Sequence, residues 1–153
     1  MKKLVEKLIK ENKTISTMES CTGGGIVNAI TNIPGSSEVL KFSAVTYSNE
    51  FKIKMGVSSE VIDKYSVYSM ETAIEMSKNI SDYTSSDYGV GVTGKLLRGD
   101  INNPYGEDNV VYVSVYDREN NKYHNSTIMC IYEKREDNKA LVIDEVIKIL
   151  LSL

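Results

Sequence analysis

The chain has 153 residues, a length typical of one domain, and its apolar (41%) and charged (25%) fractions are ordinary for a globular protein. The formal net charge is −3 and no basic stripe stands out, so the composition gives no electrostatic footprint for nucleic acid. No stretch is apolar enough to span a bilayer, and the N-terminus lacks the apolar core of a signal peptide. We therefore expect a cytoplasmic protein with neither a membrane nor a nucleic-acid partner.

Metal and disulfide chemistry are poorly supported by the residue types present. The two cysteines, Cys21 and Cys130, are far apart in sequence, and we expect both to be reduced. His124 is the only histidine, and there is no CxxC pair. We expect no metal and no cofactor, and a hydrolase built on this sequence needs a base other than histidine.

Helical and strand patterns alternate along the chain. Period-3.6 and period-2 patterns with their capping and breaking residues predict the following order. It comprises a helix ending near residue 12, a strand over 14–18, a helix over 26–31, a helical turn at 38–40, a strand over 41–47, a helical turn over 48–52, a short helix over 59–64, a longer helix capped by Ser69, a strand over 87–94, a polar loop over 95–108, a strand over 110–116, a hairpin turn over 117–122, a strand over 123–131 and a helix over 138–153.

This alternation predicts one α/β domain over residues 1–153, and the terminal hairpin makes its sheet mixed. Ligands in open α/β sheets gather at the carboxyl ends of the strands. Three loops leave strands at those ends, at residues 19–25, 48–52 and 94–106. If the three strands are parallel, the loops share one crevice.

The first of these loops is unusually rich in chemistry. Within residues 17–25, Ser20, Cys21 and Thr22 precede three glycines at a predicted strand-to-helix turn. Ser20 could be a nucleophile, with the local amides as its oxyanion hole, or Ser20 and Thr22 could simply cap the helix. Cys21 could itself attack a carbonyl, although no histidine partner is in reach, and packing under the turn is the alternative.

A lysine and a tyrosine in the second loop could complete a catalytic set with Ser20. Lysine can take the serine proton if burial or a nearby cation lowers its pKa, which makes Lys52 a candidate base. Tyr47 could relay a proton or hold the lysine. The alternatives are a solvated surface lysine and a tyrosine ring in the core.

Four motifs in order, ESCTGG (19–24), PGSS (34–37), YSNExK (47–52) and VTG (92–94), resemble the CinA C-terminal family, which includes the stand-alone nicotinamide-nucleotide amidase. The resemblance implies a three-layer α/β/α sandwich with a mixed sheet, often as a homo-oligomer. It implies a metal-free amidohydrolase that converts nicotinamide mononucleotide to nicotinic acid mononucleotide and ammonia. In that mechanism Ser20 attacks the carboxamide, Lys52 is the base and Tyr47 assists the proton transfers.

The resemblance also implies a set of residues that bind the small-molecule nucleotide. Backbone amides of the glycine-rich turn would hold the oxyanion or the phosphate, and Arg135 would bind phosphate or, alternatively, make a salt bridge at a helix entry. Lys139 stands where the family usually has a second arginine. The implied binding residues are Cys21, Thr22, Gly23, Gly24, Asn49, Gly94 and Arg135.

The sequence departs from the family pattern at residues 95–108, where small residues give way to Lys95, Leu96, Leu97 and Arg98. These side chains could fill the ribose-phosphate space, or Lys95 and Arg98 could supply charge to a phosphate. Three alternatives to a nicotinamide-nucleotide amidase follow. They are hydrolysis of another amide, a catalytically silent relative that binds a nucleotide or a partner, and a module that uses the glycine-rich turn only to bind phosphate.

Overall fold

A computed structural model describes residues 1–97, 101 and 103–153 of the chain. Its helices and strands alternate in the predicted order, and most boundaries agree with the sequence patterns within two residues. The elements are α1 (Lys2–Glu11), β1 (Ile15–Glu19), α2 (Gly25–Thr31), α3 (Ser36–Val39), β2 (Leu40–Val45), α4 (Asn49–Lys54), α5 (Ser59–Tyr65), α6 (Met70–Thr84), β3 (Tyr88–Gly94), β4 (Val110–Asp117), β5 (Lys122–Met129) and α7 (Arg135–Ser152).

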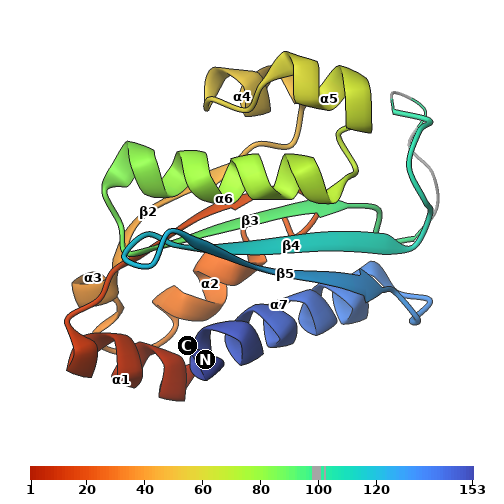
Figure 1. The fold of residues 1–153 in the computed structure, drawn as a ribbon. Coiled ribbons are helices and arrows are strands. Elements are labelled where there is room, and N and C mark those ends of the chain that lie inside the picture. Colours follow the sequence, from red (N-terminus) through yellow and green to blue (C-terminus); the bar gives the residue numbers. More distant parts are fainter. Residues whose placement is uncertain (98–100, 102) are drawn as a thin grey trace.

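The strands form one five-stranded sheet in the order β2-β1-β3-β4-β5. β1 is parallel to β2 and β3, whereas β4 and β5 are antiparallel to their neighbours. Figure 1 shows α6 across one face of the sheet with α4 and α5 beyond it, and α1, α2 and α7 on the other face. The predicted α/β sandwich with a mixed sheet is confirmed, and its helices form two outer layers.

The larger core lies between the sheet and the α1, α2 and α7 layer. Leu4, Ile26 and Val146 bring one helix each to this cluster, against β-branched residues of β3 and β4. The smaller cluster lies under α6 and contains Met18 and Met76. Each face of the sheet is therefore buried, which is why β1 and β3 read as continuous buried strands.

Two glycines in β3 determine how closely α6 approaches the sheet. A Cβ atom on Gly89 would lie 2.0 Å from the carbonyl oxygen of Ser77, and one on Gly91 would lie 2.2 Å from that of Ala73. Such contacts are sterically impossible, so any larger residue would push α6 away from β3. The helix itself begins where Ser69 accepts a hydrogen bond from the N–H of Thr72, as its sequence predicts.

Two boundaries near the C-terminus differ from the prediction. The strand expected over 123–131 ends at Met129, and the last helix begins at Arg135, three residues early. The buried Asn138 explains both, because its carboxamide accepts from the N–H of Tyr132 and donates to the carbonyl oxygen of the same residue. These bonds curl the chain toward α7 before the strand pattern in the sequence has ended.

The segment expected to be a polar loop over 95–108 has a buried beginning. Leu96 is fully buried in the larger core, which the polar-loop prediction missed. Lys95 is also buried, and its Nζ donates to the carbonyl oxygen of Gly106 at 3.0 Å and to Asp108 Oδ1 at 3.1 Å. Burial of this lysine is offset because the far end of the same segment supplies two acceptors to it.

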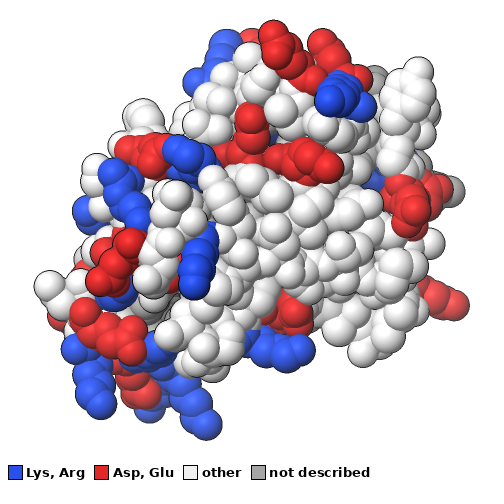
Figure 2. Space-filling view, in the orientation of Figure 1, with Lys and Arg blue, Asp and Glu red and all other residues white. Residues whose placement is uncertain are grey.

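Charges are distributed unevenly over the surface. Figure 2 shows one face whose middle carries few charged side chains, while acidic and basic groups intermingle around it. No basic stripe crosses the described residues of that face. None of the helices in the described part of the chain combines the length and the apolar character that crossing a membrane requires.

Candidate active site

The carboxyl ends of β1, β2 and β3 lie at one edge of the sheet because these three strands are parallel. The loops that follow them are joined by side-chain contacts. Lys52 in α4 reaches the turn after β1, and Asn49 Nδ2 donates to Asn103 Oδ1 in the loop after β3 at 2.9 Å. The expectation that these loops come together is confirmed.

Ser20 and Lys52 form the central contact of this edge. Lys52 Nζ lies 3.1 Å from Ser20 Oγ and donates to the carbonyl oxygen of Thr46 at 2.7 Å. The lysine side chain is only 1% exposed and Ser20 only 4%. The alternative of a solvated surface lysine is therefore excluded.

Burial determines the acidity of Lys52. Removing the ammonium ion from water disfavours its charged form and lowers the pKa of Lys52 to about 8, and the Cys21 thiol opposes this only weakly. A side chain with this pKa holds a neutral fraction near neutral pH, which an ordinary lysine does not. The neutral amine has a lone pair that can accept the hydroxyl proton of Ser20.

Tyr47 does not complete a hydrogen-bonded triad here. It follows the end of β2, its side chain is 66% exposed, and no hydrogen bond of the described residues joins its hydroxyl to Ser20 or Lys52. The preceding residue, Thr46, supplies the carbonyl oxygen that holds the lysine. Sequence reasoning missed this contact because every residue type carries a main-chain carbonyl.

Glu19 fixes the turn that carries Ser20. Its fully buried carboxylate accepts hydrogen bonds from the Thr22 hydroxyl at 2.7 Å and from the N–H groups of Ile26 and Val27 at 3.1 and 2.9 Å. The first N–H groups of α2 are thus capped by Glu19, and the sequence alternative of capping by Ser20 or Thr22 is replaced by this arrangement. The signal was present in ESCTGG, where an acidic residue ends a buried strand.

Cys21 is enclosed under the turn. Burial raises the pKa of its thiol to about 12, an effect that Cys130 increases and the Lys52 cation decreases. A thiol with such a pKa stays protonated at neutral pH and is a poor nucleophile. This environment supports packing under the turn, and it is Ser20 that contacts Lys52.

One glycine of the turn faces a cation from α7. Gly23 and Gly24 have φ angles of 62° and 88°, a region that favours glycine. A Cβ atom on Gly23 would lie 3.4 Å from Lys139 Nζ. Arg135 starts the same helix and acts electrostatically on Cys21. Lys139 therefore approaches the glycine-rich turn, and Arg135 is close enough to act on Cys21 within it, which sequence position alone could not show.

Gly94 and Lys95, two further predicted residues, have structural roles. Gly94 has a φ of 147°, and a Cβ atom there would lie 2.4 Å from the carbonyl oxygen of Val110, so close approach of β4 requires glycine. Lys95 is bound within its own loop, and Arg98 lies outside the described residues. In the described part of the chain, no three His, Cys, Asp or Glu side chains gather where they could hold a metal ion.

Comparisons with known proteins agree with this architecture. A family model described as CinA C-terminal domain matches residues 1–153. A CinA-like protein of Endomicrobium trichonymphae is 41% identical over 140 residues, which are 88% of this chain and 32% of that protein. A putative competence-damage inducible protein of Clostridium botulinum is 39% identical over 71% of this chain and 27% of its own length. The chain thus spans about a third of these curated relatives.

Solved structures show the same fold. The competence/damage inducible protein CihA of Agrobacterium tumefaciens superposes with a TM-score of 0.86 at 26% identity, over 99% of this chain and 93% of that one. A CinA superfamily protein of Klebsiella pneumoniae superposes with a TM-score of 0.88 at 20% identity, covering 97% and 91%. The layers and the strand order described above are therefore shared with experimentally determined structures.

Proposed function

The chain belongs to the CinA C-terminal domain family, and on that basis we propose that it is an amidohydrolase that converts nicotinamide mononucleotide to nicotinic acid mononucleotide and ammonia. One observation carries the proposal. A lysine that is almost fully buried, Lys52, contacts the hydroxyl of Ser20 at 3.1 Å and has a pKa lowered to about 8. This is a nucleophile with an adjacent base, the arrangement that activates a serine for acyl transfer.

The contacts of Lys52 suggest how the proton moves. The neutral amine donates one N–H to the carbonyl oxygen of Thr46, which leaves its lone pair free to accept the proton of Ser20. Ser20 Oγ then attacks the carboxamide carbon, and Lys52 returns the proton to the departing ammonia. Water hydrolyses the resulting ester, with Lys52 again as the base, and this releases the carboxylate and restores Ser20.

The negative charge on the tetrahedral intermediate needs donors near Ser20. In the described part of the chain, the N–H groups of Thr22 and Gly24 donate to no protein atom, whereas those of Ile26 and Val27 bind Glu19. We assign the oxyanion to the free amides of the turn. We assign the phosphate to Arg135 and Lys139, since the N-terminus of α2 already holds a carboxylate.

In the sequence, the unusual residues at 95–108 argue against nucleotide binding. The structure weakens that argument. Leu96 is packed in the core, and Lys95 is bound to Gly106 and Asp108. These two large side chains are accommodated inside the protein, so neither is a free group that projects toward a ligand. Hydrolysis of another amide remains the second candidate, because Arg98 and its neighbours differ in type from the family pattern.

Ammonia release from nicotinamide mononucleotide by the purified protein tests the proposal directly. Ser20→Ala and Lys52→Ala should each abolish it, while Lys54→Ala should not, because Lys54 is an exposed lysine of the same helix paired with Glu50. Wild-type protein that neither releases ammonia nor melts at a higher temperature with the nucleotide would refute it. Binding that survives Ser20→Ala without any ammonia release would identify a binding module instead.

The role that the resemblance gives to Tyr47 stays a prediction. Its hydroxyl would have to approach Ser20 or Lys52 when substrate binds, because the exposed side chain makes no such contact here. Tyr47→Phe removes only the hydroxyl. A large fall in kcat would support proton transfer through Tyr47, whereas an unchanged kcat would leave Lys52 as the sole base.

A further inference from the structure

Glu19 is the fully buried acidic residue directly before the proposed nucleophile. Its two carboxylate oxygens divide their partners between them. Oε2 accepts from the Thr22 hydroxyl and the Ile26 N–H, at 2.7 and 3.1 Å. Oε1 accepts from the Val27 N–H at 2.9 Å and, more weakly, from the Thr17 hydroxyl at 3.4 Å. A buried carboxylate with this many donors is compensated for its lost hydration.

These bonds clamp the turn at both ends. The Thr22 hydroxyl lies within the turn, and the Ile26 and Val27 amides lie at the start of α2, so one carboxylate holds both relative to β1. Ser20 lies between the clamped points and adjoins Glu19 in the chain. The freedom of its backbone is therefore limited by a side chain that does not touch the reacting atoms.

The main chain of Glu19 also positions the base. Its carbonyl oxygen accepts from the N–H of Thr46 at 2.8 Å, and the carbonyl oxygen of Thr46 accepts from Lys52 Nζ at 2.7 Å. Glu19 thus positions both members of the pair. Its side chain holds the turn that carries Ser20, and its main chain holds Thr46, which in turn binds Lys52. A reacting pair held in this way needs little reorganisation before proton transfer.

We propose that Glu19 is a positioning residue for the Ser20–Lys52 pair, and that its carboxylate serves as a permanent internal anion that closes the α2 N-terminus to the anionic group of the substrate. The inference rests on the proposed function and extends it to a residue outside the reacting set. It predicts that Glu19 governs the rate of the chemical step, and that substrate phosphate depends on the basic residues of α7.

Glu19→Gln is the informative change because it keeps the shape and removes one acceptor. Whichever way the new amide is turned, its NH2 group faces the N–H of Ile26 or of Val27, and one of these bonds is lost. The chain offers a matched control in Asp87→Asn. Asp87 likewise accepts from an N–H and a hydroxyl, both of Thr14 at 2.7 Å, at the opposite end of the parallel strands.

The experiment measures kcat, KM, the pH dependence of kcat and the melting temperature for wild type and both variants. For Glu19→Gln we expect kcat to fall about ten- to hundredfold with KM changed less than about threefold, as for a misplaced catalytic group. The pH midpoint should stay near 8, because burial sets the pKa of Lys52 and the isosteric change leaves that burial in place. Asp87→Asn should lower the melting temperature and leave kcat unchanged.

Several results would overturn the inference. Full kcat in Glu19→Gln with only a lower melting temperature would make Glu19 purely structural, and a higher KM at unchanged kcat would place it in binding. If Glu19→Gln does not fold, Thr22→Val removes one donor to the same carboxylate and should lower kcat in the same direction. An unchanged kcat in that variant would count against the clamp.

A substrate-independent measurement separates this inference from the proposed function. If wild-type protein releases no ammonia from nicotinamide mononucleotide, the proposed function fails, and the position of Ser20 is then measured with a fluorophosphonate probe that labels activated serines. We expect Glu19→Gln to be labelled at least about tenfold more slowly than wild type and Asp87→Asn at the wild-type rate. Equal labelling of both variants, or no labelling of wild type at Ser20, would overturn the inference.

Discussion

The two ends of the parallel strands use the same device for different purposes. At the amino end, Asp87 accepts hydrogen bonds from the N–H and the hydroxyl of Thr14. At the carboxyl end, Glu19 accepts from a hydroxyl and two N–H groups of the turn and α2. Each carboxylate fixes the chain next to a strand. Only the second is followed by a serine in contact with a buried lysine, so only there does the fixed geometry have a chemical consequence.

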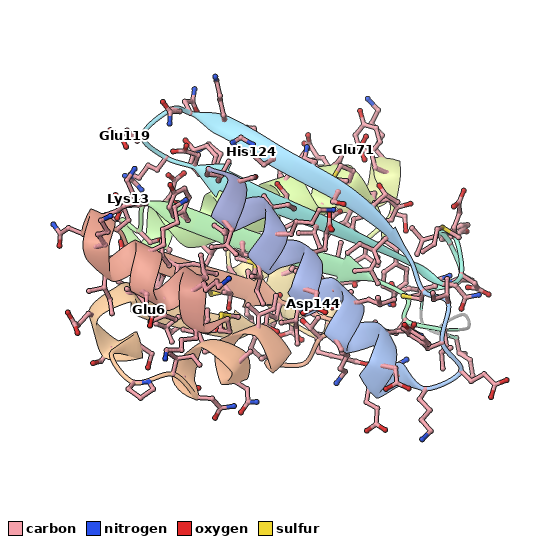
Figure 3. The ribbon with its side chains drawn as sticks, turned by 90° about the horizontal axis from the view of Figure 1, so that it is seen from below. Glu6, Lys13, Glu71, Glu119, His124 and Asp144 are labelled. Atoms are coloured by element: carbon pink, nitrogen blue, oxygen red, sulfur yellow. The ribbon has the colours of Figure 1, made fainter. Side chains whose placement is uncertain are left out.

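The amino end of the parallel strands also carries a solvent-exposed ion pair. Lys13 pairs with Glu119, and both side chains point to the same end of the molecule in Figure 3. Exposed ion pairs of this kind contribute little, because solvent screens them. Lys52 has no acidic partner among the described residues and is almost fully buried. Where a charge is placed in the fold, more than its type, decides whether it stabilises the protein or performs chemistry.

The largest expected effect comes from replacing Lys52 with arginine. An arginine keeps the positive charge but cannot lose its proton at any working pH, so it cannot accept the proton of Ser20. We expect kcat to fall by about a thousandfold or more, within the range reported for loss of a general base. Lys54→Arg on the same helix is the control and should leave kcat unchanged. Substantial activity in Lys52→Arg would show that lysine acts only through its charge.

The value of kcat should rise with pH, with a midpoint near pH 8. In the proposed mechanism the reactive form of Lys52 is the neutral amine. Burial lowers the pKa of Lys52 to about 8, so we expect the rate to climb as the ammonium loses its proton and then to level off. Initial rates at saturating nucleotide between pH 6 and 10 measure the midpoint. A midpoint near the ordinary lysine value of 10.5 would contradict the effect of burial.

The free energy of unfolding should also depend on the protonation of Lys52. The unfolded chain binds a proton at Lys52 up to about pH 10.5, whereas the folded state loses it at about 8, so folding becomes more favourable as pH rises between these values. The shift from 10.5 to about 8 corresponds to about 3–4 kcal/mol at most. Urea unfolding of wild type and Lys52→Met at pH 7.5 and 10 measures it. The free energy of unfolding of wild type, relative to that of the variant, should be larger at pH 10 than at pH 7.5. A difference that does not change with pH would refute the prediction.

The cations of α7 should affect binding more than chemistry. Lys139→Ala removes the ammonium near Gly23, so we expect KM for nicotinamide mononucleotide to rise about tenfold with little change in kcat, as for loss of one charge-assisted contact. Nicotinamide riboside, which lacks the phosphate, is the control substrate and should show no such change. An equal rise in KM for both substrates would mean that Lys139 does not bind the phosphate.

At the amino end, Asp87→Asn should affect stability alone. Although burial by itself raises the pKa of Asp87, the hydrogen bonds from Thr14 and the nearby Lys13 cation lower it below its ordinary value of 3.8. The carboxylate therefore stabilises the fold at neutral pH, and this contribution is lost as pH falls through the lowered pKa. We expect a loss of about 1–2 kcal/mol at pH 7 by urea unfolding, and a smaller loss at pH 3.

The smallest effect should follow loss of the exposed ion pair. Glu119→Ala removes the partner of Lys13, and we expect the free energy of unfolding to change by less than about 1 kcal/mol. The same measurement in 0.5 M NaCl should reduce even that difference, because salt screens exposed charges. A larger change would mean that the hairpin between β4 and β5 depends on this contact for its position.

The sequence alone determined the order of the elements and the residues that meet at the active edge. Period-2 and period-3.6 patterns are local, and they identified β1, β3, β4 and α6 closely. Residue chemistry and the family resemblance placed Ser20 and Lys52 in one candidate set, and the structure joins them at 3.1 Å. The elements were predictable because neighbouring residues in the chain specify them, whereas the Ser20–Lys52 pair, 32 residues apart, was predictable only from the motifs of the family.

Only the tertiary structure decided the electrostatics and the supporting contacts. The burial that lowers the pKa of Lys52 and the Lys139 cation over Gly23 come from segments distant in sequence, whereas the Thr46 carbonyl that holds Lys52 lies six residues away but is aimed at it by the end of β2. The early start of α7 depends on Asn138, whose buried carboxamide also donates to the carbonyl oxygen of Leu96 in a distant segment. The physical reason is common to all of them. Desolvation and main-chain acceptors depend on what packs around a group, and no residue type or local spacing encodes that.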